Sequence, residues 1–334
     1  MAATLAALAA TAAVMLGLTA RVIAYLRGRQ ILDRPNDRSS HVVPTPRGGG
    51  LAVTPAVLSG WVVAAIVGAA PAWPVLALAG AALLLMGVSW LDDRHSLPPG
   101  RRLALHAVAV LAGLAALPGD GLVFQGWLPP WADHALTALA WLWFVNLYNF
   151  MDGIDGITGV ETAVLGLGIA AVAWGSPPLA EVQPLALAAA LAGLLFLRWN
   201  WPPAQTFLGD VGSIPLGYLL GALLIVLARN GQLAAALILP AYYVADATLT
   251  LGKRALRREK IWQPHRSHFY QRAVQGGRSH AQVTTAVLAA GLGLIAAALL
   301  ARHGLPLAGL SLGGAITAGL LTVMQRWARA EKRP

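Results

Sequence analysis

The chain has 334 residues, of which 57% are hydrophobic and only 11% are charged. An average soluble domain carries about 25% charged residues, so the bilayer must be one of the solvents of this chain. The formal net charge is +10. The basic residues fall in short gaps between apolar runs and do not alternate with aromatics, which argues against nucleic-acid binding. The absence of cysteine excludes disulfides and thiolate metal sites.

Apolar runs of the length of a membrane-spanning helix recur along the chain. We expect an all-α, polytopic membrane protein with about eleven transmembrane helices (ten is the alternative), forming a single domain over residues 1–334. The first run has no basic residue ahead of it, so we interpret it as a retained helix and not as a cleaved signal peptide. The expected spans are 2–26, 51–69, 73–91, 103–118, 134–150, 158–174, 183–198, 213–228, 232–251, 281–301 and 305–325.

The distribution of lysine and arginine predicts the orientation of these helices. If the N-terminus lies outside and the helices alternate, five cytoplasmic segments hold 21 of the 24 basic residues. This split satisfies the positive-inside rule. It places the C-terminus and a long polar loop in the cytoplasm. The five segments are 27–50, 91–102, 198–212, 252–280 and 326–334.

Five aspartates lie at the predicted cytoplasmic ends of helices. Asp92 and Asp93 end the third span, Asp152 and Asp155 follow the fifth, and Asp210 precedes the eighth. Mg²⁺ prefers oxygen ligands and is commonly held by one or two carboxylates together with substrate phosphates. A carboxylate can also accept a proton from an attacking group. The pattern therefore predicts a Mg²⁺-dependent phosphoryl-transfer site, with neighbouring glycines that allow close approach of phosphate.

The segment 146–156 combines amides, carboxylates and glycines. Residues three apart on a helix drift by about 60° per step, so Asn146, Asn149 and Asp152 can share one broad face. Asp155 would have rotated away from Asn146, and the glycines beside it indicate that the helix ends or bends. We therefore expect Asp152 to bind substrate, and Asp155 either to bind substrate or to cap the loop.

Two basic motifs complete the candidate site. Arg47 begins the run Arg-Gly-Gly-Gly that opens the second span, and such a run can present backbone N–H groups to an anion. A flexible entry loop is the alternative. The motif His265-Arg266-Ser-His268 lies in the long basic loop. No third zinc ligand is nearby, so we favour hydrogen bonds to phosphate or nucleotide; incidental loop histidines are the alternative.

The order of these motifs resembles a known family. Asp92-Asp93, the stretch from Asn146 to Gly156, the stretch from Asn200 to Ser213 and the histidine motif occur in the order seen in the polyprenyl-phosphate N-acetylhexosamine-1-phosphate transferases, glycosyltransferase family 4. The resemblance covers about residues 33–280. It implies a bacterial inner-membrane enzyme with a cytoplasmic-side site and Mg²⁺, with Mn²⁺ as a substitute. It also implies a UDP-N-acetylhexosamine donor, undecaprenyl phosphate as acceptor, UMP as by-product and a homodimer.

The resemblance also implies roles for single residues. Asp210 resembles the metal ligand. Asp92 resembles the base that deprotonates the lipid phosphate, and Asp93 would assist it; a second metal contact is the alternative role of Asp92. Contacts to the nucleotide sugar are implied for Asn149, Asp152, Asn200 and, beside the uracil, Phe207.

Two departures from the family bear on the assignment. Many members have a third aspartate where this chain has Ser96, and the muramoyl-pentapeptide branch has a denser histidine cluster. The chain therefore looks more like the branch that starts O-antigen and other surface polysaccharides. The transferred sugar stays open among N-acetylglucosamine, N-acetylfucosamine and N-acetylquinovosamine. The alternatives are a muramoyl-pentapeptide-type transferase, a non-catalytic envelope scaffold, and a transporter with Glu161 and Asp246 as coupling acids.

Overall fold

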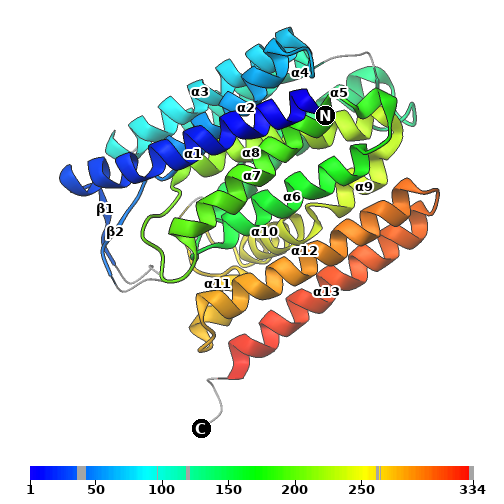
Figure 1. The fold of residues 1–334 in the computed structure, drawn as a ribbon. Helices are drawn as coiled ribbons and strands as arrows, with labels where there is room; N and C mark the ends of the chain where they lie inside the picture. Colours follow the sequence, from blue (N-terminus) through cyan, green and yellow to red (C-terminus); the bar gives the residue numbers. More distant parts are fainter. Residues whose placement is uncertain (36–42, 96, 118–120, 261–262, 264, 331–334) are drawn as a thin grey trace.

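A computed structural model describes residues 1–35, 43–95, 97–117, 121–260, 263 and 265–330. In these residues the chain folds into packed α-helices, which confirms the all-α prediction (Figure 1). One small exception is a pair of antiparallel two-residue strands, β1 (Leu32–Asp33) and β2 (Thr45–Pro46). The helices are α1 (Ala2–Gly28), α2 (Gly50–Ile66), α3 (Ala72–His95), α4 (Pro99–Ala116), α5 (Pro130–Phe150), α6 (Ile157–Ala173), α7 (Val182–Asn200), α8 (Asp210–Leu227), α9 (Leu233–Ile238), α10 (Ala241–Leu256), α11 (Phe269–Gln275), α12 (His280–Arg302) and α13 (Pro306–Ala330).

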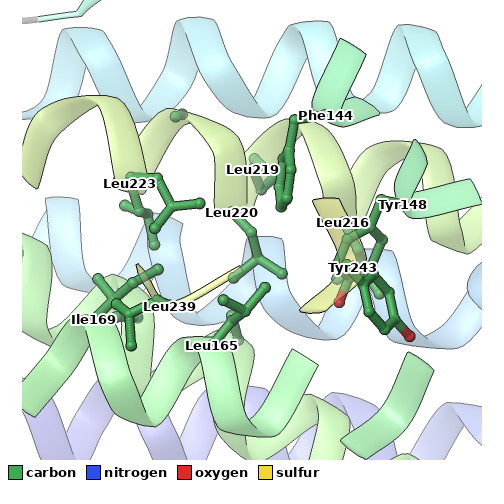
Figure 2. Close-up of a cluster of buried hydrophobic side chains, with 14 of the residues drawn as sticks. Phe144, Tyr148, Leu165, Ile169, Leu216, Leu219, Leu220, Leu223, Leu239 and Tyr243 are labelled. Atoms are coloured by element: carbon green, nitrogen blue, oxygen red, sulfur yellow. The ribbon is translucent and has the colours of Figure 1, made fainter. Parts of the chain in front are cut away.

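Helix α8 forms the centre of the bundle. It contacts α2, α3, α5, α6 and α7, and its leucines interdigitate with aromatic and branched side chains of its neighbours (Figure 2). Close packing of this kind fixes the rotation of a helix about its own axis. It therefore fixes the direction in which the N-terminus of α8 presents its polar residues. The labelled core residues are Phe144, Tyr148, Leu165, Ile169, Leu216, Leu219, Leu220, Leu223, Leu239 and Tyr243.

The peripheral helices expose large apolar side chains. Leu16 of α1, Leu84 of α3 and Leu307 of α13 are all exposed in the isolated chain. Among the described residues, six helical stretches are long and apolar enough to cross a membrane, and α2 and α6 are shorter apolar helices. Exposed leucines on such helices are what a lipid-facing surface requires.

The predicted span 232–251 is not one continuous helix. It is interrupted at Leu239–Pro240, which separates α9 from α10. The non-helical residues Asn230 and Gly231, the latter at φ 79°, lie before this span, in the predicted gap between 213–228 and 232–251. Proline cannot donate a backbone hydrogen bond and ends a helix. The predicted long loop 252–280 is also shorter than expected, because α10 continues to Leu256 and α11 occupies Phe269–Gln275.

The N-termini of α2 and α8 lie against each other. A Cβ atom placed on Gly50 would clash with the backbone of Gly212, so only glycine allows this approach. The contact joins the two glycine-rich motifs of the sequence, one before α2 and one at the start of α8. It therefore brings Arg47 and Asp210 to the same end of the bundle.

Candidate active site

Arg47 joins two carboxylates that come from distant parts of the chain. Its Nη2 atom donates to Asp210 Oδ1 at 2.7 Å and lies 3.4 Å from Asp93 Oδ1. The side chains of Asp93 and Asp210 are 20% and 17% exposed, so both remain accessible from water. We call Arg47, Asp93, Asp152 and Asp210 the acidic centre.

The backbone on either side of Arg47 is held by the segment that precedes α8. The amide of Phe207 donates to Pro46 O at 2.8 Å, and the amides of Gly48 and Gly49 donate to Phe207 O at 3.1 and 2.8 Å. Gly209 adopts φ +74°, and a Cβ atom there would lie 3.2 Å from Arg47 Cγ. The glycines thus allow two loops to pack closely enough for the arginine to reach both carboxylates.

Asp210 and Asp152 meet at the start of α8. Asp210 is the first residue of that helix, where the helix dipole favours a negative charge. Asp152 lies in the loop between α5 and α6, accepts a hydrogen bond from Thr158 Oγ1 at 2.7 Å, and receives a backbone hydrogen bond from Gly209. Burial raises the pKa of Asp152 to about 6 in spite of these bonds. Its carboxyl group therefore changes charge near neutral pH.

The arginine is firmly charged in this setting. Burial alone would lower the pKa of Arg47, but the carboxylates of Asp210 and Asp93 outweigh it and raise the pKa above its ordinary value. Among the residues that the structure describes, no group of three or more His, Cys, Asp or Glu is placed to hold a metal ion. Mg²⁺ needs only one or two carboxylates when phosphates supply other ligands. Two carboxylate oxygens that converge on one atom of Arg47 fit that requirement.

Asp92 has a different set of partners from its neighbour Asp93. Its Oδ1 accepts from the amide of Leu97 at 2.6 Å, and its Oδ2 accepts from Arg102 Nη1 at 2.8 Å. These bonds close the turn between α3 and α4. Sequence reasoning found the acidic pair but not Arg102. Ser96, the departure from the family pattern, lies outside the described residues.

The two asparagines of α5 differ in their contacts. Asn146 donates to Leu142 O at 2.7 Å, and its Oδ1 lies 3.2 Å from His106 Nδ1. Asn149 is half-buried, and its side chain has no hydrogen bond in the part of the chain that the structure describes. An amide near Asp152 with unused donors is available to a ligand.

Asp155 and Asn200 hold loops together. Asp155 Oδ2 accepts from the amide of Ala204 at 3.0 Å, and its Oδ1 lies 3.2 Å from His280 Nδ1. Asn200 is 4% exposed; it accepts from the amide of Gly156 and donates to Thr206 O, both at 2.9 Å. For Asp155 this geometry matches the loop-holding alternative. For Asn200, these two hydrogen bonds already use the side-chain amide that the resemblance assigns to binding the nucleotide sugar.

The histidine motif is organised by Asp246 of α10, which sequence reasoning did not connect with it. His268 Nδ1 lies 3.1 Å from Asp246 Oδ1, and His265 stacks on His268 with ring centroids 4.9 Å apart. Asp246 is fully buried and also accepts hydrogen bonds from the side chains of Tyr242 and Thr250 and the amides of Phe269 and Tyr270. We call this set the Asp246 hub. The available signal was an aspartate inside an apolar span.

The hub reaches the acidic centre through α11. Tyr270 donates from its hydroxyl to Phe150 O at 3.1 Å, next to the loop that carries Asp152. A Cβ atom at Gly153 would clash with the Tyr270 hydroxyl, so this contact also depends on glycine. Arg266 lines a basic cavity together with residues of α10 and α11. The structure thus connects the histidine motif to the acidic centre but gives its arginine a separate location.

These features together define a class of protein. Apolar helices long enough to cross a membrane surround an accessible centre of carboxylates and one arginine at the N-terminus of a helix. The family described as "Glycosyl transferase family 4" matches residues 75–228. The chain is 30% identical over 279 residues to a phospho-N-acetylmuramoyl-pentapeptide-transferase of Mycolicibacterium smegmatis, covering 67% of this chain and 76% of the relative. The chain therefore belongs to glycosyl transferase family 4: it is a multi-pass membrane protein and a sugar-1-phosphate transferase.

Two further relatives share most of the chain. A protein of Bacillus subtilis named "Probable undecaprenyl-phosphate N-acetylglucosaminyl 1-phosphate transferase" is 27% identical over 258 residues, covering 75% of this chain and 71% of the relative. A decaprenyl-phosphate N-acetylglucosaminephosphotransferase of Mycobacterium tuberculosis is 27% identical over 367 residues, covering 93% and 88%. The family resemblance inferred from the sequence motifs is confirmed.

Proposed function

We propose that this enzyme transfers N-acetylglucosamine-1-phosphate, or a closely similar N-acetylhexosamine-1-phosphate, from its UDP-sugar to undecaprenyl phosphate. The products are a lipid-linked pyrophosphoryl sugar and UMP. The relatives from Bacillus subtilis and Mycobacterium tuberculosis carry names for N-acetylglucosamine phosphate transfer to a polyprenyl phosphate. The observation that carries the proposal is the convergence of Asp93 and Asp210 on Arg47 at the N-terminus of α8.

The reaction needs a site that gathers two sets of phosphates. An oxygen of the lipid phosphate attacks the sugar-bearing phosphorus of the donor, and the bond from that phosphorus to UMP breaks. Phosphoryl transfer relies on positioning and on neutralising charge. Arg47 offers a fixed positive charge and a planar pair of donors for phosphate oxygens. The N-terminus of α8 adds the positive end of a helix dipole.

Asp210 and Asp93 are the residues that would hold Mg²⁺, or Mn²⁺ in its place. The metal would neutralise the donor pyrophosphate and help UMP to leave. The carboxylates are partly open, and the described residues form no closed cage around them; both features suit a cation whose other ligands are phosphate and water. A second metal contact from Asp92, the alternative to its role as the base, would require it to leave Arg102.

The UDP-sugar would lie between the C-terminal end of α5 and the N-terminal end of α8. The side chain of Asn149 has donors that no described residue uses. Asp152 lies beside Gly209, and the ring of Phe207 is half-buried two residues before Gly209. Phe207 is the residue we assign to stacking on the uracil. Asn200, Asp155 and Asn146 would support the site by holding its loops and helices in place.

We infer an inner-membrane enzyme with the acidic centre on the cytoplasmic side and the N-terminus outside, because 21 of 24 basic residues would then be cytoplasmic. Single cysteines at Gln263 and Glu181, both exposed, test this in a chain that has no other cysteine. An impermeant thiol reagent should label Glu181→Cys but not Gln263→Cys in spheroplasts. The opposite labelling pattern would reject the orientation.

The histidine motif bears on the pathway and the donor. We favour the branch that starts O-antigen and similar surface polysaccharides, because the motif His265-Arg266-Ser-His268 is less dense in histidine than in the muramoyl branch. The relative from Mycolicibacterium smegmatis keeps the muramoyl-pentapeptide substrate as a second candidate. A homodimer, implied by the family resemblance, remains part of the proposal.

One donor panel tests the function. Purified enzyme in detergent with undecaprenyl phosphate and Mg²⁺ should release UMP from UDP-N-acetylglucosamine, and mass spectrometry should find the pyrophosphoryl-linked sugar lipid. UDP-N-acetylmuramoyl-pentapeptide is the matched competitor. Faster turnover of the pentapeptide donor would move the enzyme to the peptidoglycan branch, and UMP release from neither donor would contradict the assigned substrates.

A further inference from the structure

A strongly basic cavity lies between the end of α10 and α11. Its volume is about 360 Å³. Five of the ten residues that line it are lysine or arginine, and Glu259 is the one acidic residue among them. No residue of the acidic centre lines this cavity. The lining residues are Thr250, Lys253, Arg254, Arg257, Glu259, Arg266, Ser267, Phe269, Arg272 and Gln275.

The single acid of the cavity is already paired with one of its arginines. Arg254 donates from Nε to Glu259 Oε2 at 2.7 Å and from its terminal nitrogens to the carbonyls of Gln263 and Lys260. Arg254 is buried and uses these bonds to fold the segment after α10 back onto the helix. The charges of Lys253, Arg257 and Arg272 are therefore not balanced by an acid of the cavity.

Lys253 is held in place without being neutralised. Its Nζ atom lies 4.6 Å from the ring centroid of Phe269, a cation–π contact that leaves the full positive charge available. Arg257 and Arg272 are exposed and have no salt bridge in the part of the chain that the structure describes. Basic side chains gathered around one cavity repel one another, and an anion bound among them relieves that repulsion.

The cavity is at the edge of an apolar surface. Leu256 and Leu249, on the same helix as Lys253, are 87% and 46% exposed. In a multi-pass membrane protein, an exposed leucine beside lysine and arginine at a helix end places that end at the membrane interface. A ligand of the cavity can thus combine a negative headgroup with an apolar tail lying against Leu249 and Leu256.

We propose that this cavity binds the headgroup of an anionic phospholipid of the surrounding membrane. The phosphodiester would lie among Lys253, Arg257 and Arg272, and the acyl chains would run along the outer face of α10. This site is separate from the acidic centre, and the inference does not depend on which sugar the enzyme transfers. It gives α10 and α11, which carry the Asp246 hub, a fixed depth in the bilayer.

Lipid titration of the purified full-length protein tests the site. Native mass spectrometry in a neutral detergent should detect a phosphatidylglycerol molecule that binds more tightly than phosphatidylcholine. Each Lys or Arg at an anionic lipid surface contributes about 1 kcal/mol, so Lys253→Gln/Arg257→Gln should weaken phosphatidylglycerol binding roughly 30-fold. Arg326→Gln/Arg329→Gln is the matched control, because it removes two exposed charges from the end of α13. This control variant should weaken phosphatidylglycerol binding less than about 3-fold, which is less than the loss expected from removing one Lys or Arg contact.

Other outcomes would reject the proposal. Equal binding of the two lipids, or equal loss in both double variants, would mean that only the overall positive charge matters. Competition of inorganic pyrophosphate with phosphatidylglycerol in the wild type would assign the cavity to soluble phosphates instead. Lys253→Arg/Arg257→Lys keeps the charges and should retain binding, which separates loss of the site from loss of the fold. Failure of this binding leaves UMP release unaffected, and failure of the donor panel leaves the binding unaffected.

Discussion

The acidic centre and the Asp246 hub are both built on aspartate, but the aspartates differ in their exposure to water. Asp93 and Asp210 are partly exposed, come from different helices and share one arginine. Asp246 is fully buried and receives all its hydrogen bonds from α10 and the residues at the start of α11. A carboxylate whose partners are all internal stabilises the fold, whereas one left open to water is available to a ligand. Substitutions in the acidic centre should therefore lower turnover, and substitutions in the Asp246 hub should lower stability.

The largest effect is expected at Asp210. Asp210→Asn removes a charge from the proposed metal site while keeping the size of the side chain and the start of α8. A metal contributes several kcal/mol to stabilising transition-state charge, so turnover should fall by roughly 1,000-fold. The thermal midpoint should stay near that of the wild type. UMP release measured against Mg²⁺ concentration, together with a melting curve, checks both parts.

The control for Asp210→Asn is an acid at the other end of the bundle, away from the acidic centre. Glu181 is exposed at the start of α7, and Glu181→Gln should leave turnover and its Mg²⁺ dependence unchanged. If Asp210→Asn kept near-wild-type turnover with an unaltered Mg²⁺ curve, the metal assignment would be wrong. The site would then have to be rebuilt around Asp92, Asp93 and Asp152.

The next effect in size should be at Asp246, and it should be on stability. Asp246→Asn removes the charge that holds His268 and the first amides of α11. Hydrogen bonds to charged groups contribute about 1.5–3 kcal/mol, so the free energy of unfolding should drop by about 2–3 kcal/mol. Thr250→Val, which removes one donor of the hub, should cost about 1 kcal/mol. A loss of turnover in Asp246→Asn with an unchanged thermal midpoint would contradict the structural role.

The sequence predicted the helices well where apolar runs ended at glycine or charge. The expected spans 281–301 and 103–118 correspond to α12 (280–302) and α4 (99–116). The span 232–251 was wrong as one helix, because its overall hydropathy masked the local break at Leu239–Pro240. The break at Asn230–Gly231, by contrast, falls in the gap predicted between the spans 213–228 and 232–251. Local patterning therefore gives the number of apolar segments more reliably than their continuity.

The acidic centre was predicted by residue type but not by pairing. All three of its aspartates were found, since acids are rare in this chain and sit at helix ends. The contact of Arg47 with Asp210 spans 163 positions and depends on the packing of α2 against α8, which no sequence period encodes. The link between Asp246 and His268 was missed for the same reason. Tertiary packing selects which of several plausible partners meet.

A smaller effect is expected at Phe207. Stacking of a base on an aromatic ring is worth roughly 1–3 kcal/mol, and the half-buried ring of Phe207 favours the lower part of that range. Phe207→Ala should raise the donor KM about 5- to 30-fold with kcat less affected. Phe207→Tyr keeps the ring and should retain the KM. An unchanged donor KM in Phe207→Ala would remove this residue from the uracil site.

The smallest effect should come from Asp92, the neighbour that the structure places outside the acidic centre. The second pKa of a phosphate monoester is about 6, so most of the lipid phosphate is already a dianion at neutral pH and needs little help from a base. If Asp92 is the base that the family resemblance implies, Asp92→Asn should lower kcat about 10-fold near pH 7. The defect should grow below pH 6, where the acceptor is protonated, and shrink at higher pH. The Mg²⁺ dependence should be nearly unchanged.

The contacts of Asp92 make a second outcome testable in the same variant. Both of its oxygens are occupied, by the amide of Leu97 and by Arg102, whose side chain is 36% exposed. The side chain of Asp92 itself is only 10% exposed, so Asp92 would leave Arg102 only where the arriving acceptor replaces that contact. Arg102→Gln frees Asp92 without removing it and should leave the pH profile of kcat intact. A defect of Asp92→Asn that is the same at every pH, and is matched by Arg102→Gln, would mean that Asp92 only holds the turn between α3 and α4. Proton transfer would then have to be reassigned within the acidic centre.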